Sequence, residues 1–260
     1  MLGPIKLKHV WNWTACGKHP VARDYFRLNS KAVPLLEAFS GWIEKGYQMI
    51  DPNKNKSLNQ YSWRFWAKGP DKKNLAFGIV KDSCDALGRS HPFLIMGTGP
   101  LEAWNDHWDL LPLALAETWG QMEYLSAKRL LDFTQMEDEV RIIRPPYPKW
   151  SEYTYQKGNP RAFEPFSSDK GGPGDSTDIN KSVANLTKET EFFVSLESTA
   201  YNDPLLLAGQ WHSFLKTKLN GVPNAVFMGG IPEETYLAVF VRPLVPSDFV
   251  RLWSICTRVN

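Results

Sequence analysis

Four side chains of one short segment could take part in covalent chemistry: Asp82, Ser83, Asp85 and His91. Ser83, His91 and Asp85 are the residue types of a nucleophile, a base and an orienting carboxylate. Asp82 and Asp85 are also the types of a carboxylate pair for acid–base catalysis. No glycine elbow exposes Ser83, and the four residues share one turn, so we do not expect their side chains to converge. We interpret the aspartates as turn residues that bind backbone amides, and keep a hydrolase or transferase at residues 82–91 as the alternative.

Other patterns that could hold a metal or a phosphate are incomplete. His107 lies in a helical segment with no second histidine one turn away, and Cys16 near His19 is half of a metal or thiolate site. The glycine-rich run at 171–176 lacks the lysine of a phosphate-binding loop, and no helical pattern follows it. The sequence therefore predicts no catalytic residues, no metal and no cofactor.

The segment that carries the four residues reads as a β-hairpin. Apolar runs at 75–80 and 92–96 flank a polar turn rich in Asp, Ser and Gly. The connection is too short for a helical crossover, so the two strands should pair in antiparallel fashion. Arg89, at the end of the turn, could pair with Asp85 or Asp24 to hold it, or could bind an anion.

Periodicity predicts further elements on both sides of this hairpin. Alternating aromatic and polar residues at 61–68 indicate a third strand, and apolar residues at helical spacing indicate a helix over 33–50. A continuous aromatic stripe over 104–125 predicts two consecutive helices or one kinked helix. Later elements are expected as a strand at 191–196, a helix at 203–220, a hairpin at 225–241 and a helix from 246 to 253. This order predicts an α/β fold with helices on both faces of a mixed sheet.

A change in composition divides the chain. Prolines and glycines after Arg144 predict the absence of regular structure through about residue 178. We therefore separate an N-terminal part, 1–143, from an insertion or linker, 144–188. The C-terminal strands and helices of 189–260 are expected to complete the same domain.

Bulk composition excludes several classes of protein. The 260 residues carry a net charge of +2, which gives no basis for nucleic-acid binding. Three scattered cysteines fit a reducing compartment, and no apolar run is long enough for a signal peptide or a membrane span. We therefore expect a cytoplasmic protein with no membrane insertion. The eleven tryptophans favour thick packed layers, and any that are not needed for packing are candidate anchors for a protein partner.

Three short motifs resemble those of a known family. The first is a Gly-Lys-x-Pro sequence followed by an acidic and an aromatic residue, the second is a strand sequence, and the third is a hairpin with a Ser-x-Asp-x-x-Gly-Arg-x-x-Pro turn. They stand here as Gly17, Lys18, Pro20, Asp24 and Tyr25, then Trp63, Arg64 and Phe65, then Gly78, Ser83, Asp85, Gly88, Arg89 and Pro92. In this combination the chain resembles the TagF (ImpM) family of type VI secretion-associated proteins over residues 10–130.

The resemblance implies a fold and a function. The fold would be a three-layer α/β/α sandwich around a mixed, largely antiparallel sheet. The protein would be a non-enzymatic bacterial regulator that represses type VI secretion after translation, by binding a forkhead-associated scaffold protein. A structural component of the secretion machine is a further reading. The partner-binding candidates are Lys18, Asp24, Asp85 and Arg89, and the structural candidates are Gly17, Pro20, Trp63, Phe65, Gly78, Ser83, Gly88 and Pro92.

Overall fold

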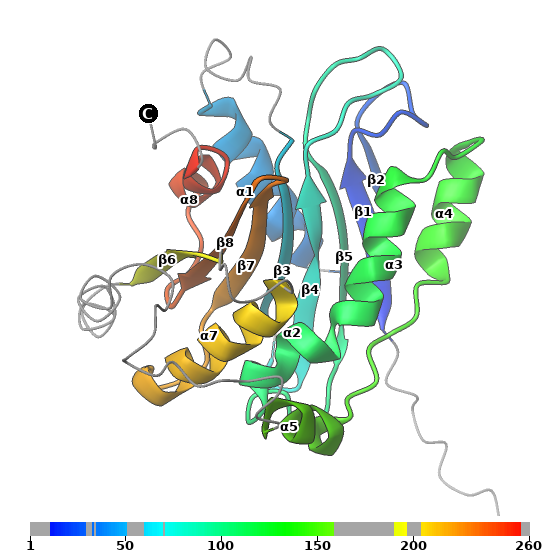
Figure 1. The fold of residues 1–260 in the computed structure, drawn as a ribbon. Coiled ribbons are helices and arrows are strands. Elements are labelled where there is room, and N and C mark those ends of the chain that lie inside the picture. Colours follow the sequence, from blue (N-terminus) through cyan, green and yellow to red (C-terminus); the bar gives the residue numbers. More distant parts are fainter. Residues whose placement is uncertain are drawn as a thin grey trace, which may run out of the picture.

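The computed structural model describes residues 11–29, 33, 35–50, 60–69, 71–158, 190–196 and 204–255. Its centre is an eight-stranded sheet with the strand order β2-β1-β5-β4-β3-β7-β8-β6 (Figure 1). The strands are β1 (Asn12–Gly17), β2 (Phe26–Leu28), β3 (Ser62–Lys68), β4 (Asn74–Lys81), β5 (Phe93–Pro100), β6 (Glu191–Ser195), β7 (Ala225–Ile231) and β8 (Glu234–Phe240). The predicted α/β class and the large antiparallel sheet are confirmed.

All neighbouring strands of this sheet run antiparallel. The expectation of a mixed sheet was therefore wrong for the described part of the chain. The predicted hairpin is present, because β4 and β5 pair from Asn74 opposite Pro100 to Lys81 opposite Phe93. Strands β6, β7 and β8 continue the sheet that β1 to β5 begin.

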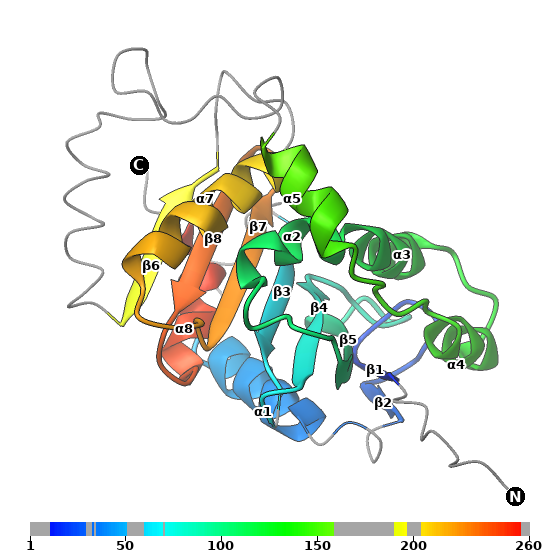
Figure 2. The same ribbon diagram turned by 90° about the horizontal axis from the view of Figure 1, so that it is seen from below.

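Helices cover both faces of the sheet (Figure 2). Helices α1 (Leu35–Gln48) and α8 (Pro246–Leu252) lie together on one face. The opposite face carries α2 (Leu111–Ala114), α3 (Ala116–Ala127), α4 (Phe133–Arg141), α5 (Trp150–Gly158) and α7 (Pro204–Lys218), with a short 3₁₀ turn, η2 (Trp108–Leu110). The aromatic stripe thus forms consecutive short helices, one of the two arrangements that we expected.

Alternate residues of each central strand enter two separate cores. On β3, Trp63 and Phe65 pack beneath α1 and α8, whereas Trp66 packs beneath α2 and α7. Because both faces are buried, β4 and β5 are nearly continuous apolar runs and show no polar alternation. This arrangement uses most of the tryptophans, since nine of the eleven are buried.

The sequence interpretation missed several elements. It predicted no strand within residues 5–28 and only a turn at 17–20, whereas β1 and β2 form an antiparallel edge of the sheet, and it did not predict α4. It excluded regular structure after Arg144, but α5 begins at Trp150, whose ring stacks on His107 and anchors the helix. The sequence predicts a polar loop over 51–60, of which residues 51–59 lie outside the described residues. The remainder of the insertion from 159 to 188 and the expected helix cap at Asp203 also lie outside them.

The contact between α1 and α8 depends on a glycine. The Trp42 indole donates a hydrogen bond to the Val245 carbonyl at 2.8 Å, and the buried Phe249 ring packs against Trp42. A Cβ atom at Gly46 would lie 2.4 Å from the Phe249 Cβ, so no side chain fits between the helices. Gly41 of the same helix has no atom within 4 Å of such a Cβ.

We expect Gly46→Ala to lower the free energy of unfolding by about 1–3 kcal/mol, because the added methyl group overpacks the α1–α8 contact. Gly41→Ala is the matched control and should raise this free energy by up to about 1 kcal/mol through helix propensity. Urea denaturation measures both. Equal effects of the two substitutions would contradict the tight contact.

A buried histidine links β3 to α7. The His212 ring is fully buried, its Nε2 accepts a hydrogen bond from the Trp66 indole at 3.1 Å, and its Nδ1 donates to the Ala208 carbonyl at 2.6 Å. Burial lowers the pKa of His212 to about 4, against the opposing effects of the Ala208 carbonyl and Asp109. Protonation at Nε2 would also remove the acceptor that Trp66 uses.

Because the folded pKa of His212 lies below the unfolded value of 6.5, the unfolded chain binds more protons between pH 6.5 and about pH 4. The stability that neutral His212 provides is complete above pH 6.5 and should fall by roughly 3 kcal/mol on acidification to pH 4. Denaturation at a series of pH values should show this loss in the natural protein and a shallower one in His212→Gln. Parallel pH profiles would contradict the assignment.

Candidate functional site

The β4–β5 loop is organised around the carboxylate of Asp85. This side chain is fully buried. Its Oδ1 accepts hydrogen bonds from the backbone N–H groups of Leu87 and Arg89, each at 2.9 Å. Its Oδ2 accepts the Arg89 Nε–H at 2.7 Å and lies 3.3 Å from the Lys18 Nζ. Four donors from two segments therefore converge on one carboxylate, which we call the Asp85 lock.

These donors keep the lock ionised. Burial by itself would raise the pKa of Asp85. The backbone N–H groups of Arg89 and Leu87 and the side chains of Arg89 and Lys18 outweigh burial and lower the pKa to about 2. The carboxylate therefore carries its full charge at neutral pH.

Arg89 extends the lock to the turn between β1 and β2. Its guanidinium donates to the Arg23 carbonyl at 2.6 Å and lies 3.4 Å from the Asp24 carboxylate. The Ala86 N–H also donates to the Ala22 carbonyl, so backbone and side chains join the two segments. Of the two partners expected for Arg89, Asp85 and Asp24, the structure shows both.

The candidate contact residues differ in their exposure. The side chain of Lys18 is 14% exposed, that of Arg89 is 49% exposed and that of Asp24 is 73% exposed. Lys18 and Asp85 thus face inward and hold the loop, whereas Arg89 and Asp24 present surface to solvent. The structure brings all four together.

The predicted structural residues occupy tight positions around the lock. Gly17 ends β1 with φ at 120°, and a Cβ atom there would lie 2.1 Å from the carbonyl oxygen of Pro92. Gly88, with φ at 76°, makes the turn that returns the chain to Arg89. Trp63, Phe65 and Gly78 lie in the central strands, Pro20 lies in the β1–β2 turn, and Ser83 accepts the His91 N–H through its carbonyl oxygen.

Among the described residues, the possible catalytic side chains do not form a catalytic arrangement. Asp82 accepts hydrogen bonds from the Trp253 indole at 2.6 Å and from the Tyr61 N–H at 2.9 Å, and burial raises its pKa. The Nδ1 of His91 bonds to the Pro92 carbonyl at 2.8 Å rather than to a carboxylate. Asp85 is committed to the lock. This geometry gives no support to a Ser–His–Asp or paired-carboxylate mechanism.

The incomplete metal patterns also have structural roles. Cys16 is buried, and burial raises the pKa of its thiol to about 11. His19 is buried and accepts the Val21 N–H. Burial and the charge of Lys81 lower the pKa of His19, against the effect of its hydrogen bond with the Ser126 backbone. Within the described part of the chain, no three His, Cys, Asp or Glu side chains are grouped to hold a metal ion.

The lock joins the same segments that carry the resemblance, and the comparison with protein families agrees. Residues 14–142 match the family described as the TagF N-terminal domain, type VI secretion system-associated. The chain belongs to the TagF family. A comparison with curated proteins found no match.

One solved structure that resembles the TagF-family chain is PA0076 from Pseudomonas aeruginosa PAO1. The two share 18% sequence identity, with a TM-score of 0.41, over 52% of this chain and 64% of that chain. The match therefore spans less than two thirds of PA0076. No helix in the described part of this chain is long and apolar enough to cross a membrane.

The sequence did not reveal every connection of the site. The contact between Lys18 and Asp85 and the tether from Trp253 to Asp82 join residues far apart in the chain, and no spacing rule indicates them. For the contact between Lys18 and Asp85, the only indication in the sequence is that two turn motifs carry opposite charges. No sequence pattern indicates the tether from Trp253 to Asp82, because a tryptophan in an apolar helix face is typical of core packing.

We expect Asp85→Asn to loosen the β4–β5 loop, because the amide removes the negative charge to which Lys18 and Arg89 bind. Hydrogen exchange at the Leu87 and Arg89 amides should become faster by on the order of tenfold. Since the folded pKa of about 2 lies below the unfolded 3.8, the stabilising effect should be complete above pH 4 and disappear towards pH 2.

Asp71→Asn is the matched control. The Asp71 carboxylate accepts the N–H groups of Lys73 and Asn74 in an exposed turn and makes no ion pair with a cation of the described chain. This substitution should change exchange only near its own turn. Unchanged exchange at Leu87 and Arg89 in Asp85→Asn would show that the lock does not order the loop.

Proposed function

We propose that this protein is a non-enzymatic regulator of type VI secretion, which acts after translation as a repressor by binding a forkhead-associated scaffold protein. The observation that carries the proposal is the match of residues 14–142 to the TagF N-terminal domain. The side chains of Asp82, Asp85 and His91 are engaged in structural hydrogen bonds, and a regulator that acts by binding needs no catalytic group. No feature of the described residues specifically favours the alternative that the protein is a structural component of the secretion machine.

The architecture supports the proposal that the chain forms one binding domain, which we place in the cytoplasm as part of the same proposal. Helices on both faces of one sheet support the three-layer sandwich. The place of β6, β7 and β8 in that sheet supports the view that residues 189–260 complete the domain that 1–143 begins. The helical segment at 150–158, within the insertion, packs beside η2 and α2.

Among the four candidate contact residues, Asp24 and the outer part of Arg89 are accessible to a partner. Asp24 suits a test because it is the most exposed, and its bond to the Tyr25 N–H and its ion pair with Arg89 are peripheral to the lock. Lys18 and Asp85 would support binding indirectly, by fixing the loop that presents Arg89.

We expect deletion of the gene to increase secretion of type VI substrates without changing the amounts of the machine's components. Asp24→Lys should fail to restore repression and should weaken binding of the purified scaffold by roughly tenfold, because it replaces the ion pair with Arg89 by a repulsion that displaces the Arg89 guanidinium from its place on the surface. Isothermal titration calorimetry and secretion assays measure the two effects.

Asp138→Lys on α4 is the control, because this aspartate is similarly exposed and lies outside the lock. It should retain binding and repression. Unchanged or reduced secretion after deletion would refute the repressor role, and a purified scaffold that does not bind would refute the partner.

A further inference from the structure

A cleft of about 1230 Å³ opens beside the Asp85 lock, at the end of the sheet where β4 ends and β3 begins. One wall is the last turn of α1, with Tyr47 and Ile50. The second is the beginning and end of the β4–β5 loop. The third is the end of α3 and the residues after it, and the β1–β2 turn adds His19.

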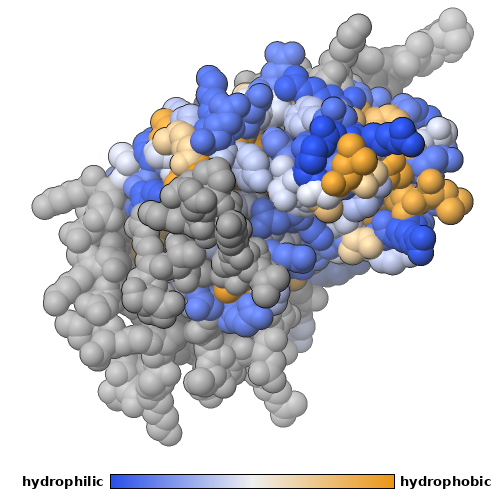
Figure 3. Space-filling model, turned by 90° about the horizontal axis from the view of Figure 1, so that it is seen from above, coloured by the Kyte–Doolittle hydropathy of each residue, from blue (hydrophilic) through white to orange (hydrophobic). Residues whose placement is uncertain are grey.

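Exposed apolar side chains stand beside three of these walls. Met49 follows the end of α1, between the cleft-lining Gln48 and Ile50. Leu131 follows the cleft-lining Leu130, and Leu87 is in the middle of the β4–β5 loop. They are 58%, 89% and 67% exposed, in that order. Seen from this end of the molecule, apolar and strongly hydrophilic residues lie next to one another on the described surface (Figure 3). Exposed apolar side chains next to a cleft with polar walls are typical of a protein-binding surface.

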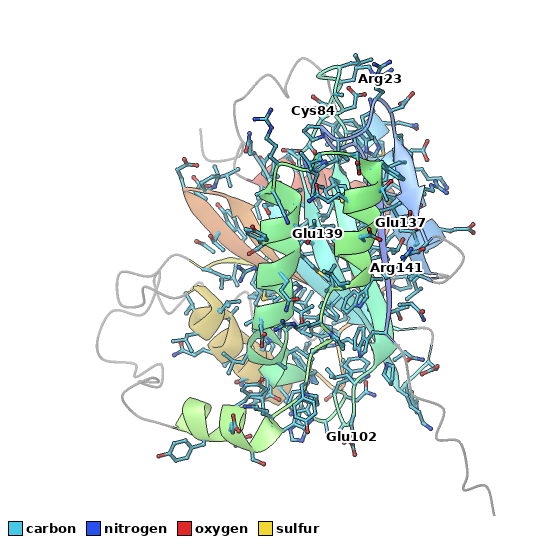
Figure 4. All side chains as sticks on the ribbon, turned by 90° about the vertical axis from the view of Figure 1, so that its right-hand side faces the viewer. Arg23, Cys84, Glu102, Glu137, Glu139 and Arg141 are labelled. Carbon is cyan, nitrogen blue, oxygen red and sulfur yellow. The ribbon has the colours of Figure 1, made fainter. Side chains whose placement is uncertain are left out.

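The charged side chains at this end of the sheet differ in whether they have a partner within the protein. Each carboxylate has partners: that of Asp82 accepts from the Trp253 indole, and that of Asp85 binds the lock donors. The Asp24 carboxylate binds Arg89 and the Tyr25 amide. By contrast, the side chains of Arg129 and Arg23 have no ion-pair or hydrogen-bond partner in the described part of the chain. Lys81 makes no close ion pair or side-chain hydrogen bond there, although its charge acts on the Asp82 carboxylate. Lys81 and Arg129 line the cleft, and Arg23 lies at the same end as Cys84, which also lines it (Figure 4).

From these observations we infer that the cleft is the docking site for an acidic segment of the partner protein. Apolar side chains of the segment would pack against Leu87 and Leu131, and its carboxylates would pair with Arg129, Lys81 and Arg23. This inference rests on the proposed function and specifies the chemistry of the partner. The Asp85 lock holds one wall of the cleft in place before binding, which reduces the entropy lost on association.

The test is calorimetric titration of the full chain with the purified forkhead-associated scaffold protein. Leu131→Ser and Leu87→Ser should each weaken binding at least tenfold, and Arg129→Glu should weaken it further. The affinity of the natural protein should also fall as the salt concentration is raised from 50 to 500 mM, because salt screens the pairs between the carboxylates of the segment and the basic side chains. Thermal unfolding confirms that each variant remains folded, as expected for exposed residues.

Ile142→Ser and Arg144→Glu are the matched controls, since both residues are exposed and lie beyond the far end of α4. They should bind as the natural protein does. Equal binding by all variants would overturn the cleft as the docking site while leaving the proposed function intact. A natural protein that does not bind the scaffold would overturn both. If the chain sediments as a dimer that Leu131→Ser dissociates, the surface is an interface between two copies and the inference is wrong.

Discussion

The rest of the structure depends on the burial of both faces of one antiparallel sheet. Side chains of β3, β4, β5 and β7 enter one of two cores, and helices seal each core from water. On a strand buried on both faces, a polar side-chain group without a hydrogen-bond partner costs free energy. The Trp66 indole of β3 avoids this cost by donating to His212 of α7. Groups that recognise a partner must therefore lie at the sheet ends or on the outer helix surfaces.

The Asp85 lock converts one sheet end into an ordered surface. A buried carboxylate without partners would be unstable, and four donors from two segments remove that penalty. The Trp253 indole binds Asp82 at the start of the same loop, so the C-terminal helix also fixes it. Residues from the beginning, middle and end of the chain thus position one loop. The C-terminal part therefore stabilises the N-terminal motifs although the family match ends at residue 142.

Sequence patterns predicted the central elements well because those elements are apolar and regular. The hairpin of β4 and β5, the strand β3 and the amphipathic α1 all follow from local periodicity. The edge strand β2 and its neighbour β1 were missed because aromatic and polar residues mix there and the sheet, not a local pattern, determines their pairing. Helix α5 was missed because the prolines before Trp150 were taken to exclude structure through residue 178, whereas proline is tolerated next to a helix start.

The sequence predicted which residues form the candidate site, but not which role each residue has. Motif spacing pointed to Lys18, Asp24, Asp85 and Arg89, and the structure brings their side chains together. It also separates those that hold the loop from those that face solvent, which depends on packing that the sequence does not encode locally. Tryptophan abundance suggested aromatic anchors, yet most tryptophans are buried in the two cores.

The exposed apolar side chains beside the lock are instead aliphatic, and this difference bears on how the surface could work. A large aromatic residue left in water at a loop tip would favour aggregation, whereas isolated leucines are tolerated on a soluble surface. Leu87 and Leu131 belong to two different connections, and the β1–β2 turn is bonded to both, through Ala22 to the β4–β5 loop and through His19 to the end of α3. A partner that bridges the two leucines would contact surfaces whose relative position is already set by these bonds. In the proposed docking site, the buried charges of the lock would therefore supply the rigidity, and the exposed apolar side chains would supply the contact.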